Sequence, residues 1–125
     1  MAPKKQGPLK FGAIEPLSEY YEDVDGKRYC VSRLIEEAKN LPVFDLPLAG
    51  LDLSQAIWQK ADIFGLAYHC KKVNRSDLSF PIILAWDGAI ADGRHRIIKA
   101  LMLGKTTIKA KRITWRLTPC KDGDA

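Results

Sequence analysis

Residues 89–104 constrain the fold more than any other stretch of the chain. They read AIADGRHRIIKALMLG, in which a short apolar stretch leads into Asp92-Gly93 and then into a cationic segment with helical periodicity. An Asp-Gly pair favours a tight turn, and glycine adopts the positive φ at which many helices end. The segment therefore predicts a short strand, a turn and a helix over about 94–103 that stops at Gly104.

Further short elements are predicted on both sides of this segment. They are a β-hairpin at 20–30 that turns at Asp25-Gly26, a helix at 32–41 ended by Pro42, an edge strand at 43–48, a helix at 62–73 capped by Asp62, a buried strand at 80–85 and an alternating strand at 106–115. With 125 residues, 46% of them apolar and 28% charged, the chain has the length and balance of one globular domain. We expect a flexible basic tail at 1–15, a domain at 16–117 and a C-terminal tail at 118–125.

Helical spacing assigns a buried apolar face to each predicted helix. The residues on these faces are Leu34, Ile35, Ala38 and Leu41 in the first helix, Ile63, Leu66, Ala67 and Cys70 in the second, and Ile97, Ile98, Leu101 and Met102 in the third. Arg94 falls within the third face, whereas Arg96 and Lys99 fall on the opposite side, which is predicted to be solvated. An arginine on an apolar face either extends past the helix end into solvent or binds an anion.

Positive charge is concentrated at the C-terminal end of the chain. Residues 1–91 hold 11 Lys and Arg against 12 Asp and Glu, whereas residues 92–125 hold 9 against 3, which gives the whole chain a formal net charge of +5. Such asymmetry favours an anionic partner, either a nucleotide or a nucleic acid. The alternative, which the charge count supports equally, is a solvated basic face that aids solubility.

Cysteine usage and hydropathy indicate a cytoplasmic protein without a membrane partner. The three cysteines form no CxxC pair, so neither a zinc site nor a disulfide framework is expected, and reduced thiols are the simple interpretation. Apolar runs such as 81–86 are much shorter than the roughly 20 residues of a membrane-spanning helix. The basic N-terminal stretch lacks the apolar region of a secretory signal.

The start of the helix at 94–103 is the strongest candidate binding site. The first N–H groups of a helix lack intrahelical partners and carry a partial positive charge, so Arg94 and Arg96 at that point favour a phosphate. Gly93 would let a ligand approach the backbone closely. His95 could donate to phosphate or act as an acid–base group, or it could form only a local hydrogen bond. Asp92 could hold a metal-bound phosphate or transfer a proton, or simply serve as a turn residue or helix cap.

The pattern DGRHRxxKAxxxG, followed by a strand of the form IxAxR, resembles the signature of the ParB/sulfiredoxin-like superfamily. LPVFDLPLAGLDL at 41–53 is similar to the first conserved box of that superfamily, and about residues 29–115 fit its order of elements. The resemblance implies an α+β fold, with a small mixed β-sheet and about three helices around a nucleotide pocket. It also implies binding of CTP or ATP, with Mg²⁺, through Gly93, Arg94, His95 and Arg96.

Departures from the family pattern narrow the expected function. The sulfinic acid reductases carry a cysteine where this chain has Arg94, and the partitioning proteins continue into a helix-turn-helix domain, so neither activity is expected. The remaining prediction is a nucleotide- or nucleic-acid-phosphate-binding module, either DNA-associated or regulatory. One alternative is a small nuclease or nucleotide-dependent phosphotransferase that uses Asp92, His95 and a divalent metal in the same pocket. A kinase would also need a carboxylate base opposite the phosphates, for which Asp45 and Asp52 are the candidates. Another is a protein-binding module with a vestigial pocket.

Three further groups of residues carry weaker signals. Lys109, Lys111 and Arg112 form a basic strand predicted to lie next to the pocket, where they either follow a nucleic-acid backbone or form an exposed sheet face. Trp58, Trp86 and Trp115 could stack on bases, although a place in the core or at its rim is the commoner role. His69 is interpreted as structural or exposed. No metal-ligand cluster is visible, so no resident metal is predicted, and the oligomeric state is left open.

Overall fold

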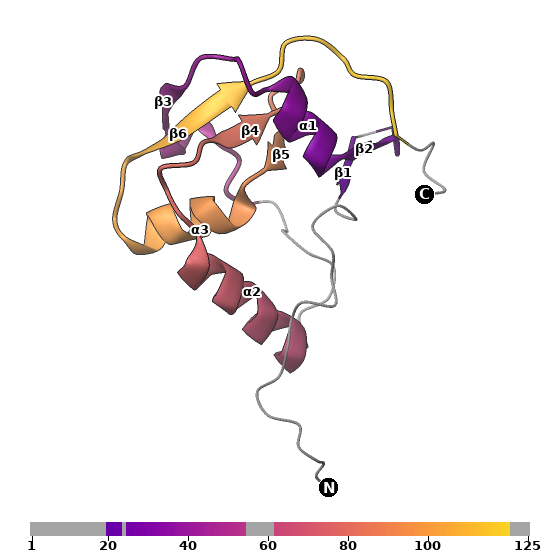
Figure 1. Cartoon of the computed structure of the whole chain (residues 1–125). Helices are drawn as coiled ribbons and strands as arrows, with labels where there is room; N and C mark the ends of the chain where they lie inside the picture. The colour runs from indigo at the N-terminus through magenta and orange to yellow at the C-terminus, as the bar shows by residue number, and fades with distance from the viewer. Residues whose placement is uncertain (1–19, 24, 55–61, 121–125) are drawn as a thin grey trace, which may run out of the picture.

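The computed structural model describes residues 20–23, 25–54 and 62–120. In chain order its elements are β1 (Tyr20–Glu22), β2 (Arg28–Cys30), α1 (Val31–Glu37), β3 (Phe44–Pro47), the 3₁₀ turn η2 (Leu48–Gly50), α2 (Ile63–Arg75), β4 (Ile82–Leu84), β5 (Ile90–Asp92), α3 (Arg94–Met102) and β6 (Thr107–Arg112). Three α-helices and two small sheets confirm the predicted α+β class (Figure 1). Among the described helices, none has the length and apolar character needed to cross a bilayer.

The larger sheet is mixed and has the strand order β3-β6-β4-β5. Strand β6 pairs antiparallel with β3 and parallel with β4, and β4 pairs antiparallel with β5. Strand β3 lies at an edge, as Pro47 predicts, because proline cannot donate to a second neighbour. The predicted hairpin at 20–30 is confirmed as the separate β1-β2 sheet, in which Gly26 has a φ of 81°.

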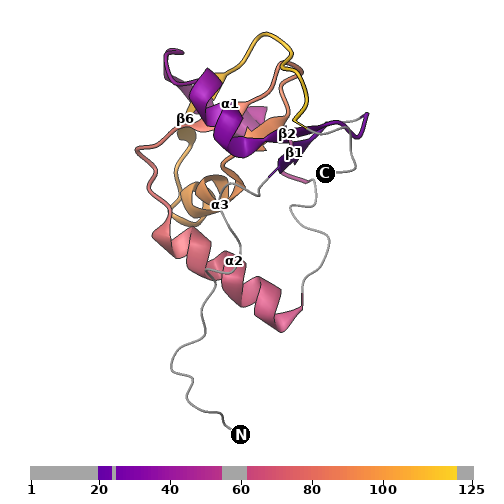
Figure 2. The ribbon, with the colours of Figure 1, turned by 45° about the vertical axis from the view of Figure 1, so that its right-hand side comes forward.

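Strand β4 is buried on both faces of the larger sheet. Ile83 packs with Tyr29 and Leu34 in a cluster that joins the sheet to α1 and the hairpin. Ile82 and Leu84 pack in a second cluster with Ile97 and Ala100 of α3, among others. The sheet therefore lies between α1 on one face and α3 on the other, and α2 lies beyond α3 (Figures 1 and 2).

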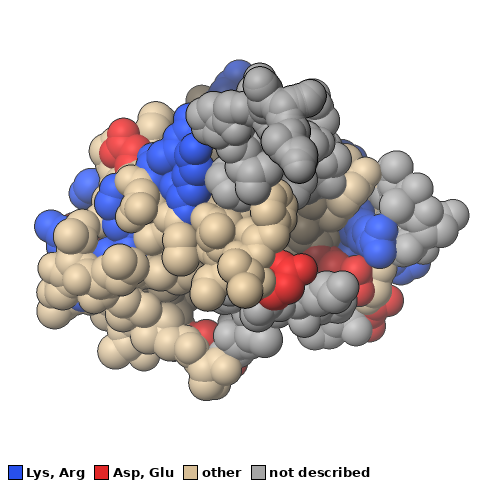
Figure 3. All heavy atoms as spheres, turned by 90° about the horizontal axis from the view of Figure 1, so that it is seen from below, with Lys and Arg blue, Asp and Glu red and all other residues tan. Residues whose placement is uncertain are grey.

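The predicted apolar face of α2 is wrong. Asp62 does cap the helix, since its side chain accepts a hydrogen bond from the Gly65 N–H at 2.6 Å. However, Ile63 is 90% exposed, and the other three residues assigned to that face, Leu66, Ala67 and Cys70, are also exposed. Because α2 packs on α3, its inner side carries the buried Val73 together with the half-buried Tyr68, His69 and Lys72. Figure 3, which views the molecule from below Figure 1, shows uncharged residues over much of the described surface, with Lys and Arg gathered in separate patches.

The predicted faces of the other two helices need smaller corrections. In α1, which ends at Glu37 and so before Pro42, Leu34 is buried but Ile35 is half exposed. In α3, Ile97 and Ala100 form the buried side. Leu101 and Met102, which were assigned to that side, are exposed, and Met102 is 69% exposed. Alanine is only weakly hydrophobic, so the sequence pattern did not single out Ala100. In the structure its small side chain is fully buried where α3 packs on the sheet.

The polar side of α3 is not solvated as predicted. Arg96 donates to the backbone carbonyl of Pro81, and Lys99 donates through Nζ to the carbonyls of Ser76 at 2.7 Å and Asn74 at 3.0 Å. These contacts tie α3 to the end of α2 and to the loop before β4. Lys99 is also well placed electrostatically, because the carboxyl end of a helix favours a cation.

The expectation of reduced thiols is wrong for two of the three cysteines. Cys30 and Cys120 form a disulfide between residues 90 positions apart in the sequence. Residues 118–120 therefore lie against the hairpin and α1, where the Thr118 carbonyl accepts from Arg33 and the Cys120 N–H donates to Arg28. Cys70 is an exposed free thiol. The pairing removes the cysteine argument for a cytoplasmic location.

The described tryptophans differ in burial. Trp86 packs edge-on against Tyr29, with ring centroids 5.0 Å apart, and borders the core as expected. Trp115 is 40% exposed. Trp58 lies outside the described residues.

Candidate functional site

Two adjoining cavities of about 560 Å³ each lie at the start of α3. Both are lined by Lys72 of α2, by His95 of α3 and by the Asp92-Gly93 turn. The first, which we call the basic cavity, is also lined by Arg75, Arg96, Ser32 and Ser76. The second, which we call the aromatic cavity, is also lined by Tyr20, Phe64, Tyr68, His69 and Arg94. Of the predicted site residues, Asp92, Gly93 and His95 line both cavities, Arg96 lines the basic one and Arg94 the aromatic one.

Gly93 has a different role from the one predicted. Its φ of 112° is in the left-handed region, which favours glycine. A Cβ atom at this position would lie 2.5 Å from Cγ2 and 2.8 Å from Cβ of Ile82. The space beside Gly93 is thus filled by a core side chain of β4. Packing and backbone conformation, and not a ligand, account for the glycine.

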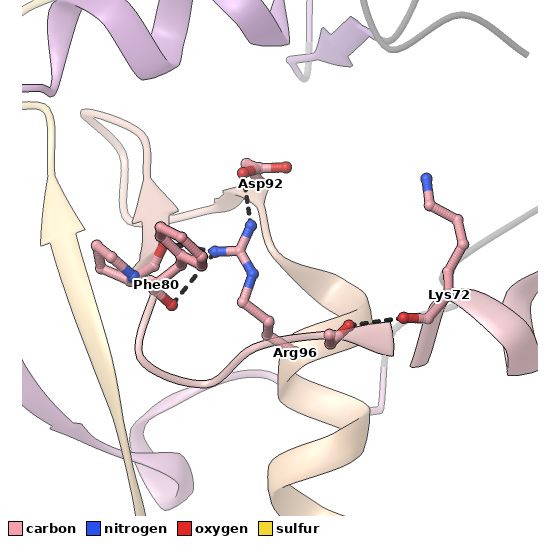
Figure 4. Close-up of polar contacts among 6 residues, drawn as sticks. Lys72, Phe80, Asp92 and Arg96 are labelled. Atoms are coloured by element: carbon pink, nitrogen blue, oxygen red, sulfur yellow. Dashed lines mark hydrogen bonds and ion pairs between the residues drawn. The ribbon is translucent and has the colours of Figure 1, made fainter. Parts of the chain in front are cut away.

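Arg96 and Asp92 bind each other beside the basic cavity (Figure 4). The Arg96 Nη2 atom lies 3.1 Å from Oδ2 of Asp92, and the two side chains are only 20% and 17% exposed. Nη1 of Arg96 donates to the carbonyls of Pro81 and Phe80. Arg96 therefore fixes the start of β4 and neutralises Asp92. Asp92 is not the helix cap, because the cap position of α3 is Gly93.

Arg94 is half-buried, and its Nε atom is fully buried, so the side chain does not extend entirely into solvent past the helix end. Burial lowers the pKa of Arg94, while Tyr21 and then Asp92 act in the opposite direction. Burial also raises the pKa of Tyr21 to about 12. Arg94 thus places a partly desolvated cation in the wall of the aromatic cavity.

His95 forms a pair with His69 that the sequence analysis missed. His69 Nδ1 lies 2.7 Å from His95 Nε2, and the two rings meet edge to edge, with centroids 4.9 Å apart and an interplanar angle of 15°. Burial, and then the charge of Lys72, lowers the pKa of His69. The 26 residues between the histidines give no local pattern. The available signal was the helical spacing of Gly65, Tyr68, His69, Lys72 and Ser76 on one polar side of α2.

Lys72 and Arg75 were also missed, because they belong to the part of the chain without excess positive charge. Both line the basic cavity. Figure 4 shows the Lys72 side chain extending from α2 on the same side as the Asp92 carboxylate. Since Asp92 is paired with Arg96, the described residues that line the basic cavity carry more positive than negative charge.

Of the three cations of the basic strand β6, Lys111 lies near the site, because it lines a further cavity of about 460 Å³ together with Asp92 and Arg96. Lys109 forms an ion pair with Asp45 at 3.3 Å. Lys111 donates to the Ala38 and Lys39 carbonyls at the end of α1, and Arg112 donates to the Trp86 carbonyl at 2.9 Å. The described lining of the two cavities includes none of these three cations, and neither Asp45 nor Asp52.

Within the described residues, no group of three or more His, Cys, Asp or Glu side chains is arranged to hold a metal ion. The chain matches no family model, no curated protein and no solved structure. The function must therefore be argued from the site itself.

Proposed function

We propose that the protein binds a phosphate-bearing ligand, a nucleotide or a nucleic-acid phosphate, at the start of α3. The observation that carries the proposal is the convergence of Lys72, Arg75 and His95 with the first turn of α3 around the basic cavity. A helix N-terminus with cationic side chains is a favourable environment for phosphate. The only carboxylate in the described lining of that cavity, Asp92, is neutralised by Arg96.

The aromatic cavity supports a nucleotide as the ligand. Phe64, Tyr68 and His69 provide ring faces and edges of the kind on which bases stack, and they lie beside the cations of the basic cavity. CTP and ATP, suggested by the resemblance in the sequence, fit this division into a base and a phosphate chain. Because the described residues provide no metal cluster, any Mg²⁺ would enter on the phosphates.

Binding without turnover is the favoured form of this function. A nuclease or phosphotransferase that uses Asp92 as a base would first have to separate it from Arg96, which also bonds two backbone carbonyls. A module of this kind would act as a regulatory or DNA-associated accessory protein.

Calorimetric titration of the full chain with CTP, ATP and GTP, with and without Mg²⁺, tests the proposal. We expect at least one nucleotide to bind. Lys72→Met should weaken binding about tenfold or more, since a hydrogen bond to a charged group contributes about 1.5–3 kcal/mol. Lys109→Met is the matched control and should bind as the wild type does. If neither these nucleotides nor a single-stranded oligonucleotide binds at low salt, the proposal is wrong.

A further inference from the structure

His69 and His95 are joined in a way that the phosphate-binding proposal does not require. They come from different helices, and their nearly coplanar rings meet edge to edge, with Nδ1 of His69 2.7 Å from Nε2 of His95. Both residues line the aromatic cavity, and His95 also lines the basic cavity. Any change in the protonation of the pair therefore occurs in the wall of the proposed ligand site.

The contact between the rings limits how many protons the pair can hold. A nitrogen–nitrogen distance of 2.7 Å requires one N–H donor and one lone-pair acceptor. When both rings are neutral, this condition is met. When one ring becomes cationic, the condition is still met, and the hydrogen bond becomes charge-assisted. When both rings are cationic, two N–H groups face each other and the pair must separate. The pair can accept one proton without rearrangement, but not two.

The surroundings disfavour the cationic form of His69. The described titratable and charged groups that line the aromatic cavity around it are Tyr20, Asp62, Tyr68, Lys72, Asp92 and Arg94. Burial and the charge of Lys72 lower the pKa of His69, so the cationic form is disfavoured in the unliganded protein. A phosphate bound beside Lys72 and His95 would offset that cationic charge and favour protonation of the pair.

We propose that His69 and His95 act as one proton-accepting unit, which couples binding of the anionic ligand to the uptake of a single proton. His69 is the positioning residue, because the hydrogen bond between its Nδ1 atom and Nε2 of His95 orients the His95 ring. This inference rests on the proposed function and specifies its regulation: affinity for the anion should rise as pH falls, up to the uptake of one proton.

Sulfate is the probe for the test, because its own charge does not change over the range in which histidine titrates. Its binding to the full chain is measured by calorimetry at several pH values, in buffers of different ionisation enthalpy. We expect proton uptake to reach one per sulfate and no more, with affinity rising by up to about tenfold per pH unit. Uptake of two protons would show independent histidines, and uptake of none would show that the pair is not coupled to the ligand; either result overturns the inference.

Two variants separate positioning from a general structural effect. His69→Phe removes the polar partner of His95, and should weaken sulfate binding at low pH while leaving it nearly unchanged at high pH, where the pair is neutral. His69→Asn keeps a polar atom near the position of Nδ1 and should restore part of the loss. Equal weakening by His69→Phe at every pH would overturn the positioning role.

Titration of the two histidines by NMR in the unliganded protein provides the independent check. Coupled rings should titrate in two separated steps, and His69→Phe should change the titration of His95. Two independent single-step titrations would show that the two rings are not coupled and would overturn the inference. If sulfate and the nucleotides all fail to bind at any pH, the proposed function fails. If they bind without proton uptake, only the present inference fails.

Discussion

The start of α3 and strand β6 are both rich in cations, but those cations contact different groups. On β6, Lys109, Lys111 and Arg112 reach the Asp45 carboxylate or backbone carbonyls of neighbouring elements. At the start of α3, Arg94 and His95 line the aromatic cavity, whereas Lys111 of β6 borders a cavity with Asp92 and Arg96 but donates to the backbone carbonyls of the two residues after α1. The comparison teaches that charge density in the sequence does not identify a binding site. The site depends on whether the fold leaves a space in front of the charges.

The position of each element explains the difference. Strand β6 lies inside the sheet between β3 and β4, so its side chains pass directly over neighbouring elements. Lys111 reaches the end of α1, where a cation is favoured by the helix dipole. The start of α3 instead faces the space between α1 and α2, which contribute Ser32 and Lys72 to the basic cavity.

The largest expected effect concerns Gly93, on which the geometry of the α3 start depends. Gly93→Ala should lower the free energy of unfolding by roughly 3 kcal/mol or more, because a left-handed φ and overlap with Ile82 add together. Gly93→Val should lower the free energy of unfolding further, because valine is larger and β-branched. The matched control is Gly104→Ala, where φ is 74° and no atom lies within 4 Å of the added Cβ. It should cost only about 1–2 kcal/mol. Equal losses for the two alanine variants, measured by urea unfolding, would contradict the packing role of Gly93.

A smaller effect is expected on ligand affinity when the two regions are compared directly. Arg94→Ala should weaken nucleotide binding by about tenfold or more, because it removes a partly buried cation from the cavity wall. Arg112→Ala removes the same side chain from β6 and should leave affinity unchanged. Calorimetry on both variants, with circular dichroism to verify folding, checks the prediction. Equal weakening by both substitutions would show that net charge, and not the cavity, governs binding.

The cations of β6 should affect stability more than binding. Lys111→Met removes two hydrogen bonds to the end of α1 and should cost about 1 kcal/mol of unfolding free energy. Lys109→Met breaks only an exposed ion pair, and should change stability by no more than about 0.5 kcal/mol. Urea unfolding of both variants measures the difference. A larger loss from Lys109→Met than from Lys111→Met would reverse our assignment of their roles.

The smallest effect is expected for nucleic-acid binding through β6. Because Lys111 and Arg112 are engaged by backbone carbonyls, only Lys109 would contact phosphate readily. Neutralising all three cations should therefore change the log–log salt slope for duplex DNA by no more than about 0.9. Mobility-shift assays at two salt concentrations test this. A change in slope near 2.7, the value for three phosphate contacts, would show that all three β6 cations contact nucleic acid.

Local stereochemistry made several elements predictable from sequence. The Asp62 cap, the turn at Gly26 and the helix end at Gly104 each depend on interactions within a few residues. The edge position of β3 follows in the same way from Pro47. The candidate site was found in part for the same reason, because Asp92 to Arg96 are consecutive and open a helix.

Tertiary structure alone decided the remaining features, since they depend on which elements pack together. The Cys30–Cys120 disulfide joins residues 90 positions apart, and the contact between His69 and His95 exists only because α2 crosses the start of α3. Periodicity gave α2 an apolar face, but it could not show that α2 packs on a helix terminus and not on the sheet. The side of α2 that faces inward buries Val73 and brings Lys72 and His69 to the cavities, while Ile63 is left in solvent.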